Sequence, residues 1–304
     1  MSAVQDVTKP ASRAPLALDL LRSARPRQWI KNGFVFAALI FASKLGHADL
    51  VARSVAAFVL FSLLSGAIYL LNDVADREAD RQHPAKKLRP IAAGRVPAQL
   101  AAAVAGVAMV IGLALSFLLG VQFGILAAVY VALMIGYTNV LKHLVLIDVF
   151  VIAAGFVLRA AAGAFVIHVV ISPWLYLCTT LLALFLAFGK RRHELLLLDE
   201  SAGGHRRNLE QYSATLLDDY INIVAGATVI SYSLYTFFAS AVPRNHAMMI
   251  TIPFVLYGVF RYLLLINRTD VGGAPEEAIW RDTPLLIDLL LWAVAAAVIL
   301  RAFH

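Results

Sequence analysis

The sequence predicts an all-α polytopic membrane protein, a bundle of nine transmembrane helices. Hydrophobic residues make up 61% of the 304 residues, and charged residues make up only 15%. A soluble domain carries roughly 25% charged residues, so this composition is typical of a chain that lies within a bilayer. Apolar segments long enough to cross a membrane also recur along the whole chain. Together, these observations leave no room for a large separate soluble domain.

Nine apolar segments have about the length of a membrane-spanning helix, which needs roughly 17 to 25 residues. The expected helices are residues 29–46, 51–72, 98–118, 120–138, 146–168, 173–189, 220–241, 247–266 and 284–303. Residues 1–28 are polar and basic, and we expect them to form an N-terminal cytoplasmic segment. Residues 29–304 then form a single transmembrane domain with two long polar loops, 73–97 and 190–219.

The distribution of positive charge predicts the orientation, because cytoplasmic loops are enriched in Lys and Arg. With the N-terminus in the cytoplasm, most of the 26 Lys and Arg residues fall on the cytoplasmic side. The opposite side then carries Lys44, Arg53, Arg244 and Arg301. We therefore expect a multi-pass protein of the plasma membrane with both long loops in the cytoplasm.

Several function classes are not indicated by the sequence. The net charge of +7 is explained by membrane topology and by anionic ligands, so it does not indicate nucleic-acid binding. Cys178 is the one cysteine, which excludes an intrachain disulfide and a cysteine-based metal site. The sequence also lacks a P-loop, a dinucleotide-binding glycine motif, a His-Glu-x-x-His motif and a Gly-x-Ser-x-Gly motif.

Three aspartates at the end of the second expected span are the strongest functional signal. The motif consists of Asn72, Asp73, Asp76 and Asp80, and on a helix the three acids share one face. Neighbouring carboxylates repel one another unless a cation neutralises them, and Mg²⁺ prefers such oxygen ligands together with substrate phosphates. We therefore predict that the three aspartates are catalytic and, with Asn72, bind Mg²⁺. The alternative is a solvated helix end in which Arg77 pairs with Asp73.

Basic residues close to this motif are candidates for binding a phosphorylated substrate, because Lys and Arg neutralise phosphate oxygens. These candidates are Lys86 and Arg89 in the first long loop and Lys190, Arg191 and Arg192 at the start of the second. The two loops are then active-site loops. For the second group, neutralisation of the helix C-terminal dipole is an alternative. For both groups, another alternative is the positive charge that cytoplasmic loops carry for topology.

Four further polar residues lie inside the spans or at their cytoplasmic ends. They are Lys31, Tyr137, Lys142 and Arg159, and we predict that they contact substrate. Arg159 lies within the fifth span, where a charged side chain is costly and indicates function. Pairing with Asp288 or Asp148 is its structural alternative. The alternatives are snorkelling for Lys31, an interfacial aromatic position for Tyr137, and an ion pair with Asp148 for Lys142.

The aspartate motif, placed after the second of nine expected spans, resembles the first metal-binding motif of the UbiA superfamily of intramembrane prenyltransferases. The resemblance extends to the span count, the placement of the loops and the Arg89-Pro90 pair. It implies a UbiA-type helix bundle in which two aspartate motifs hold a polyprenyl diphosphate through Mg²⁺. Asn72, Asp73, Asp76 and Asp80 match the first of these motifs completely.

The second aspartate motif is replaced by the basic sequence that begins at Lys190. With RPRQWIKN (25–32), YTNVLKHL (137–144) and GFVLRAAAG (155–163), this departure is similar to one branch of the superfamily. Members of that branch transfer 5-phosphoribose from phosphoribosyl pyrophosphate (PRPP) to decaprenyl phosphate for cell-wall arabinan synthesis. The resemblance therefore implies an Mg²⁺-dependent phosphoribosyltransferase whose partners are PRPP and a polyprenyl phosphate lipid.

The aspartate motif and the basic cluster also fit this chemistry when the resemblance is left aside. PRPP carries a diphosphate and a separate 5-phosphate, which match one metal motif and one basic cluster. The basic cluster would hold either the 5-phosphate or the lipid phosphate. Because the lipid phosphate is already an anionic nucleophile, no general base is required, and catalysis would depend on positioning and on stabilisation of the leaving group.

Two other functions remain open at this stage. A prenyltransferase would use a polyprenyl diphosphate donor and an aromatic or lipid acceptor, but the missing second acidic cluster argues against it. A transporter of a phosphorylated lipid would place charged residues near the midplane of both halves of the chain. Here the charges gather at one face, which favours an enzyme that uses a cytoplasmic substrate.

Overall fold

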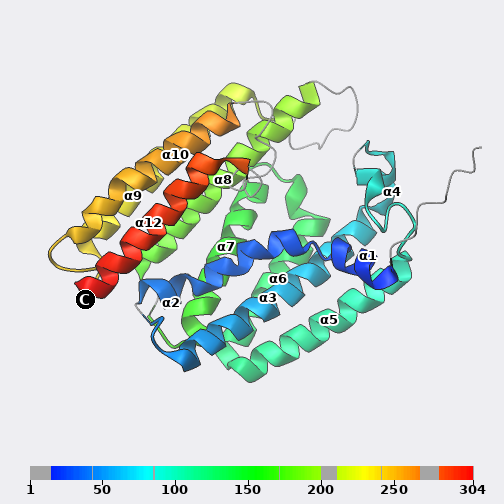
Figure 1. Cartoon of the computed structure of the whole chain (residues 1–304). Coiled ribbons are helices and arrows are strands. Elements are labelled where there is room, and N and C mark those ends of the chain that lie inside the picture. Colours follow the sequence, from blue (N-terminus) through cyan, green and yellow to red (C-terminus); the bar gives the residue numbers. More distant parts are fainter. Residues whose placement is uncertain are drawn as a thin grey trace, which may run out of the picture.

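The computed structural model describes residues 15–303 apart from 43, 85, 171, 200–210, 241 and 268–280, with the backbone alone at 197–199. Every regular element in these ranges is a helix, and the longer ones pack side by side (Figure 1). In chain order the α-helices and 3₁₀-helices (η) are α1 (Leu16–Ser23), η1 (Pro26–Phe36), α2 (Ala37–Phe41), α3 (Ala48–Ala75), α4 (Arg77–Gln82), η2 (Lys86–Leu88), α5 (Ala98–Leu119), α6 (Val121–Asn139), η3 (Leu141–His143), α7 (Ile147–Val166), α8 (Pro173–Asp199), α9 (Ala214–Phe238), η5 (Ala247–Thr251), α10 (Ile252–Ile266) and α12 (Thr283–Ala302).

The expected fold class, an all-α membrane bundle, is confirmed. Within the described ranges, eight helices are long and apolar enough to cross a bilayer. They are α3, α5, α6, α7, α8, α9, the η5–α10 pair and α12. Their starts carry the expected signals: Pro173 opens α8, and the side chains of Ser213 and Asp282 accept hydrogen bonds from the first turns of α9 and α12.

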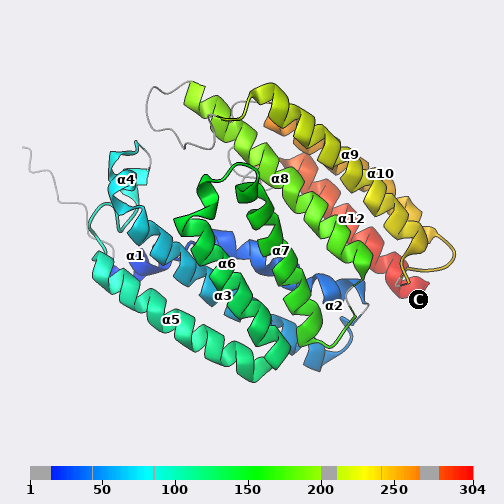
Figure 2. The same ribbon diagram turned by 180° about the vertical axis from the view of Figure 1, so that it is seen from behind.

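Helix α7 joins two groups of helices. On one side it packs against η1, α2, α3 and α6, and Ala162 and Val166 belong to the apolar core formed there. On its other side it packs against α8, and Val149 and Ala153 belong to a second core with α9 and α10. Figure 2 shows α7 between α6 and α8. The two cores therefore share one helix, and a displacement of α7 would disturb both.

The first long connection and the C-terminal end of α8 lie at the same end of the bundle. Figures 1 and 2 place α4 and the C-terminal end of α8 at that end, while the C-terminus of the chain lies at the opposite end. Both predicted loops are partly helical: 73–97 contains α4 and η2, and α8 continues past its expected end at residue 189 to Asp199. The basic cluster that begins at Lys190 therefore lies on a helix. Residues 200–210 of the second loop and 1–14 of the N-terminal segment lie outside the described residues.

The first expected span, 29–46, differs from the prediction in its conformation. Instead of one long α-helix, it consists of the eleven-residue 3₁₀-helix η1 followed by the five-residue helix α2. Runs of 3₁₀-helix beyond about four residues are uncommon and mark strain or function. Non-α backbone is tolerated at membrane depth where protein covers it. Contacts with α3 and α7 provide such a cover for η1.

Hydrogen bonds and close packing hold η1 against its neighbours α3 and α7. The fully buried amide of Asn32 donates hydrogen bonds to the hydroxyl oxygens of Ser62 (3.1 Å) and Ser65 (3.2 Å) on α3. On α7, Gly163 allows a close approach, since a Cβ atom there would lie 1.9 Å from the carbonyl oxygen of Val35. The segment is therefore fixed by hydrogen bonds to α3 and by close backbone packing against α7.

Gly163→Ala should destabilise the protein, because η1 would have to move away from the added Cβ atom. We expect the melting temperature in detergent to fall by on the order of 5 °C. Gly106→Ala on α5 is the matched control, because nothing lies within 4 Å of its added atom and Ala favours helix. Equal melting temperatures for the two variants would contradict the close packing of η1 on α7.

Candidate active site

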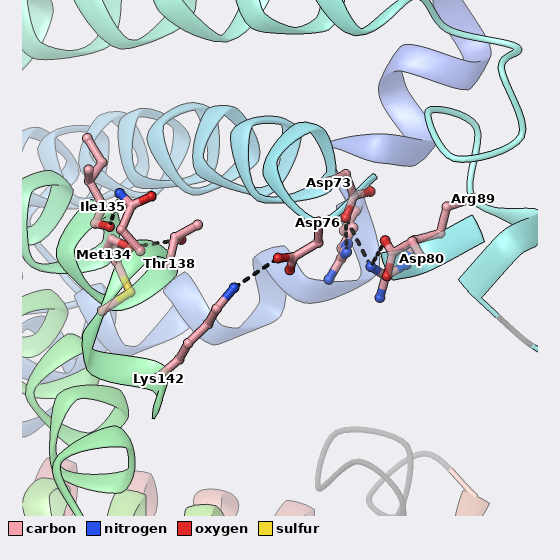
Figure 3. A network of polar contacts seen from close by, with 10 residues as sticks. Asp73, Asp76, Asp80, Arg89, Met134, Ile135, Thr138 and Lys142 are labelled. Carbon is pink, nitrogen blue, oxygen red and sulfur yellow. Dashed lines mark hydrogen bonds and ion pairs between the residues drawn. The ribbon is translucent and has the colours of Figure 1, made fainter. Parts of the chain in front are cut away.

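The aspartate motif lies at a junction between two helices. Helix α3 ends at Ala75, Asp76 adopts φ −90° and ψ 7°, and α4 begins at Arg77. Helical hydrogen bonding continues across the junction, because the Asp76 N–H donates to the Asn72 carbonyl (2.9 Å) and the Asp80 N–H to the Asp76 carbonyl (2.8 Å). The three acids therefore lie on one continuous stretch of helical backbone, and Figure 3 shows Asp73 and Asp80 facing Arg89 while Asp76 faces Lys142.

Asp73 and Asp80 share one basic partner. A terminal nitrogen of Arg89 lies 3.2 Å from the Asp73 carboxylate and 2.6 Å from the Asp80 carboxylate. Arg25, which directly precedes η1, also forms an ion pair with Asp73, and its guanidinium lies 4.9 Å from the centre of the Tyr69 ring. Both carboxylates are buried, and a buried charge without a partner is costly. The arginines therefore make the burial of these acids possible.

Asp76 points away from the other two acids, toward η3 (Figure 3). Its carboxylate accepts a hydrogen bond from the Lys142 ammonium at 2.9 Å. Lys142 thus pairs with Asp76, a partner that was not considered from the sequence. The alternative pairing of Arg77 with Asp73 is not formed, and Arg77 lies 3.9 Å from Glu78 instead.

The donor atoms of the motif fit a hard divalent cation. They comprise three carboxylates and the buried side-chain oxygen of Asn72, which has no hydrogen-bond partner among the described residues. No three Asp, Glu, His or Cys side chains in the described ranges are gathered closely enough to hold a metal ion. Asp73 and Asp80 face the same arginine, whereas Asp76 faces Lys142. Metal binding by all three would therefore require these carboxylates to change partners.

The remaining lysines predicted to contact substrate surround this end of the bundle. Lys86 lies on η2, and its backbone N–H donates to Nδ1 of His83 at 3.4 Å. Burial, followed by the positive charge of Lys86, lowers the pKa of His83, so the neutral imidazole can accept this hydrogen bond. Lys31 on η1 and Lys190 on α8 are half-buried, and both are engaged in contacts within the protein.

Arg191 lies where three helices meet. Its Nε lies 2.7 Å from the carboxylate of Asp148 at the start of α7, and its guanidinium also pairs with Glu194. It donates a hydrogen bond to the Tyr137 hydroxyl at the end of α6 (3.2 Å). The side chains of Arg191 and Asp148 are 1% and 0% exposed. Arg191 therefore connects α6, α7 and α8 through a buried ion pair.

Arg192 makes a different set of contacts. Its guanidinium pairs with Asp218 on α9 and donates to the Ile266 carbonyl (3.0 Å) and to the Asn267 side-chain oxygen (2.9 Å). These contacts join α8 to α9 and to the end of α10. The basic cluster predicted from the sequence is thus divided, because its two arginines are bound to separate parts of the bundle.

Arg159 is buried within α7 and has uncharged partners. Its Nε donates to the Asn32 side-chain oxygen at 2.7 Å, and its terminal nitrogens donate to the Gly155 carbonyl (2.8 Å) and the Tyr130 hydroxyl (2.7 Å). The guanidinium also lies 4.6 Å from the centre of the Tyr130 ring. Arg159 therefore links α7 to η1 and α6, and it does not form the ion pairs with acidic residues that were considered from the sequence.

Arg25 and Tyr130 are among the members of these networks that were not predicted as site residues. Arg25 had a weak signal, since it directly precedes Pro26 and the first apolar segment on the same side of the membrane as the motif. Nothing in the sequence indicated Tyr130, because it lies among the apolar residues of its span, 29 positions from Arg159.

Comparison with known proteins identifies relatives along nearly the whole chain. Residues 33–281 match the UbiA prenyltransferase family. Over 306 residues the chain is 36% identical to the decaprenyl-phosphate phosphoribosyltransferase of Mycolicibacterium smegmatis, with 95% of each chain covered. It is also 36% identical over 300 residues to the protein of the same name from Corynebacterium glutamicum, covering 96% of this chain and 89% of that one.

Solved structures show the same fold. The structure of a UbiA homolog from Archaeoglobus fulgidus bound to DMAPP and Mg²⁺ superimposes with a TM-score of 0.67. The match covers 93% of this chain and 99% of the homolog at 15% sequence identity. The similarity at this identity concerns the fold, and it agrees with the helical bundle described above.

Asp148→Asn should destabilise the protein strongly, because it removes a buried carboxylate from the buried Arg191 side chain. We expect the free energy of unfolding to fall by about 3 kcal/mol, as measured by SDS-induced unfolding in detergent. Glu78→Gln is the control, since Glu78 is 74% exposed and should contribute little. Similar stability of both variants would show that Asp148 does not hold Arg191, which would then be available to bind phosphate.

Proposed function

Because this chain belongs to the UbiA prenyltransferase family, we propose that it is a membrane-embedded transferase that moves 5-phosphoribose from PRPP to a polyprenyl phosphate such as decaprenyl phosphate. The observation that carries this proposal is the 36% identity, over 95% of the chain, to a relative named for that reaction. The replacement of a second acidic cluster by Lys190, Arg191 and Arg192 supports the same choice of donor.

The donor diphosphate is assigned to the aspartate motif. Asn72, Asp73, Asp76 and Asp80 would hold Mg²⁺ there, as their donor atoms fit this ion. Bound Mg²⁺ would neutralise the diphosphate and stabilise it as a leaving group. Solved structures of the Archaeoglobus homolog with Mg²⁺ support the use of a divalent metal by this fold.

Basic side chains around the motif would bind the phosphate oxygens. Arg25 and Arg89 already lie at Asp73, and Lys142 lies at Asp76, so each is within reach of a ligand held by the carboxylates. Lys86 on the adjacent η2 extends this positive surface. As the bond between ribose C1 and the diphosphate oxygen breaks, these cations would stabilise the charge that develops on the leaving group.

The acceptor phosphate would attack C1 directly. One phosphate oxygen of the lipid forms the new bond to C1, and the diphosphate leaves with the electrons of the broken bond. Since the attacking oxygen is already ionised, the protein need only position it and exclude water. This requirement agrees with the lack of a general base in the predicted site.

An apolar cavity of about 560 Å³ supports an isoprenoid acceptor. It lies between the η1–α2 segment and helices α8, α9, α10 and α12, and Phe34, Phe41 and Trp292 are among its lining residues. Phe34 belongs to the same η1 segment whose preceding residue, Arg25, pairs with Asp73. A lipid chain in this cavity would therefore lie along the segment that begins at the aspartate motif.

Within the basic cluster, the contacts favour different roles. Arg191 and Arg192 are held by Asp148, Glu194 and Asp218, so we assign to them the task of joining the helices. Lys190 is then the residue of the cluster proposed to bind the ribose 5-phosphate or the lipid phosphate. We propose that the same polar region is lined by Tyr137, Lys31 and Arg159. Arg159 would contribute by holding Asn32 of η1 through its hydrogen bond.

The proposed orientation follows from the donor and from the charge distribution. PRPP is a soluble metabolite, and the Lys- and Arg-rich ends of the helices lie on the side of the aspartate motif. We therefore propose a multi-pass protein of the plasma membrane whose N-terminus and active site face the cytoplasm.

Purified protein with Mg²⁺, PRPP labelled in the ribose and a polyprenyl phosphate should move label into the organic phase, and EDTA should stop the transfer. Asp73→Asn and Asp76→Asn should lower the turnover number by at least about a hundredfold. Their melting temperatures in detergent serve as the control for folding.

Two results would count against this proposal. Near-normal turnover by both aspartate variants would remove the motif from the reaction. Turnover of a prenyl diphosphate, without transfer from PRPP, would favour an ordinary prenyltransferase, the function suggested by the Archaeoglobus homolog bound to DMAPP.

A further inference from the structure

Every carboxylate of the aspartate motif is paired with a basic side chain of the protein itself. The pairs are Asp73 with Arg25 and Arg89, Asp80 with Arg89, and Asp76 with Lys142. Figure 3 shows Lys142 and Arg89 approaching the motif from opposite sides. The basic residues come from three places in the chain, before η1, after η2 and within η3. Three negative charges are therefore balanced by three positive charges.

This balance has different consequences for a metal ion and for a metal–diphosphate complex. Mg²⁺ alone would add positive charge beside three cations and would have to displace them from the carboxylates. A diphosphate ester carries more negative charge than one Mg²⁺ neutralises, so the complex also supplies phosphate oxygens to the displaced cations. Only the complex offers a new partner to every charged group.

We propose that Arg25, Arg89 and Lys142 act as internal counterions, which keep the aspartate motif from binding Mg²⁺ by itself and admit it together with a diphosphate. For the identity of that diphosphate as PRPP, this inference rests on the proposed function. On binding, the carboxylates exchange a basic side chain for the metal, and the basic side chains exchange a carboxylate for phosphate oxygens. No charged group is left without a partner.

At Asp73 the exposure of the paired groups agrees with such an exchange. Asp73 is 2% exposed, while Arg25 and Arg89 are 27% and 28% exposed, so these two cations lie on the solvent side of the acid. An incoming phosphate can therefore reach the arginines before the carboxylate is uncovered.

At Asp76 the order is reversed, because the acid is 32% and Lys142 11% exposed, so that carboxylate is itself open to an incoming metal ion. The ion pair of Arg191 with Asp148 differs, because both side chains are almost fully buried and no such approach exists.

The first test is the binding of Mn²⁺ alone to the full-length protein in detergent, followed through the electron paramagnetic resonance signal of unbound Mn²⁺. Arg89→Gln removes the cation that contacts both Asp73 and Asp80. We expect it to bind Mn²⁺ about tenfold more tightly than the wild type, a difference of about 1.4 kcal/mol. Lys142→Gln, which releases Asp76, provides a second variant with the same expected direction.

Arg81→Gln is the matched control. It removes the same charge from the same connection between α3 and α5, but Arg81 contacts Glu78 and the Ala92 carbonyl instead of the motif. Its Mn²⁺ affinity should equal that of the wild type. An equal gain in all three variants would reveal an effect of net charge and would overturn the inference.

The second test is the retention of labelled PRPP by each variant in the presence of Mn²⁺. Arg89→Gln should bind PRPP more weakly although it binds Mn²⁺ more tightly, whereas simple loss of structure would weaken both. Wild-type affinity for Mn²⁺ in both Arg89→Gln and Lys142→Gln would overturn the counterion role. If the Mn²⁺ difference is present but the wild type retains no PRPP, the counterion role stands and the proposed donor is wrong.

Discussion

A charged side chain that leaves water needs a partner, and this requirement determines how the two halves of the bundle are held together. The buried pair of Arg191 and Asp148 joins α8 to α7, and Arg192 joins α8 to α9 and α10. At the other side of α7, Arg159 meets the same requirement with neutral oxygens from η1 and α6. These polar contacts thus lie at the boundaries between helices. Apolar packing alone would specify the relative positions of the helices only weakly.

The same contacts connect the scaffold to the aspartate motif. Arg25 precedes η1, and η1 is held by Asn32, which contacts both α3 and Arg159. The position of one counterion of the motif therefore depends on a network deep in the bundle. Lys142 has a comparable link, since η3 joins α6 to α7. A substitution far from the motif can therefore move one of these basic residues. It would alter the charge balance at the carboxylates although it contacts none of them.

Apolar run lengths were sufficient to predict the helical class and most of the spans, because each helix must satisfy its own backbone within the bilayer. The aspartate motif was also visible, since its residues lie within two helical turns. The ion-pair and hydrogen-bond partners could not be predicted in this way, because Arg25 and Asp73 are 48 positions apart and Asn32 and Arg159 are 127 positions apart. Spacing rules reach one or two turns along a helix, whereas these pairs depend on which helices become neighbours. The junction between α3 and α4 at Asp76 and the 3₁₀ conformation of η1 could not be predicted for the same reason, because tertiary contacts stabilise both.

The 3₁₀ conformation of the first segment changes how far a short stretch of chain can reach. A 3₁₀-helix rises about 2.0 Å per residue and an α-helix about 1.5 Å. The eleven residues of η1 and the five of α2 therefore extend over roughly 30 Å, which is about the thickness of the hydrocarbon core. The same residues as one α-helix would measure roughly 24 Å and fall short of the far interface. A stretched backbone would thus let these sixteen residues serve as a ninth crossing, and with nine crossings the two ends of the transmembrane domain would lie on opposite sides of the membrane.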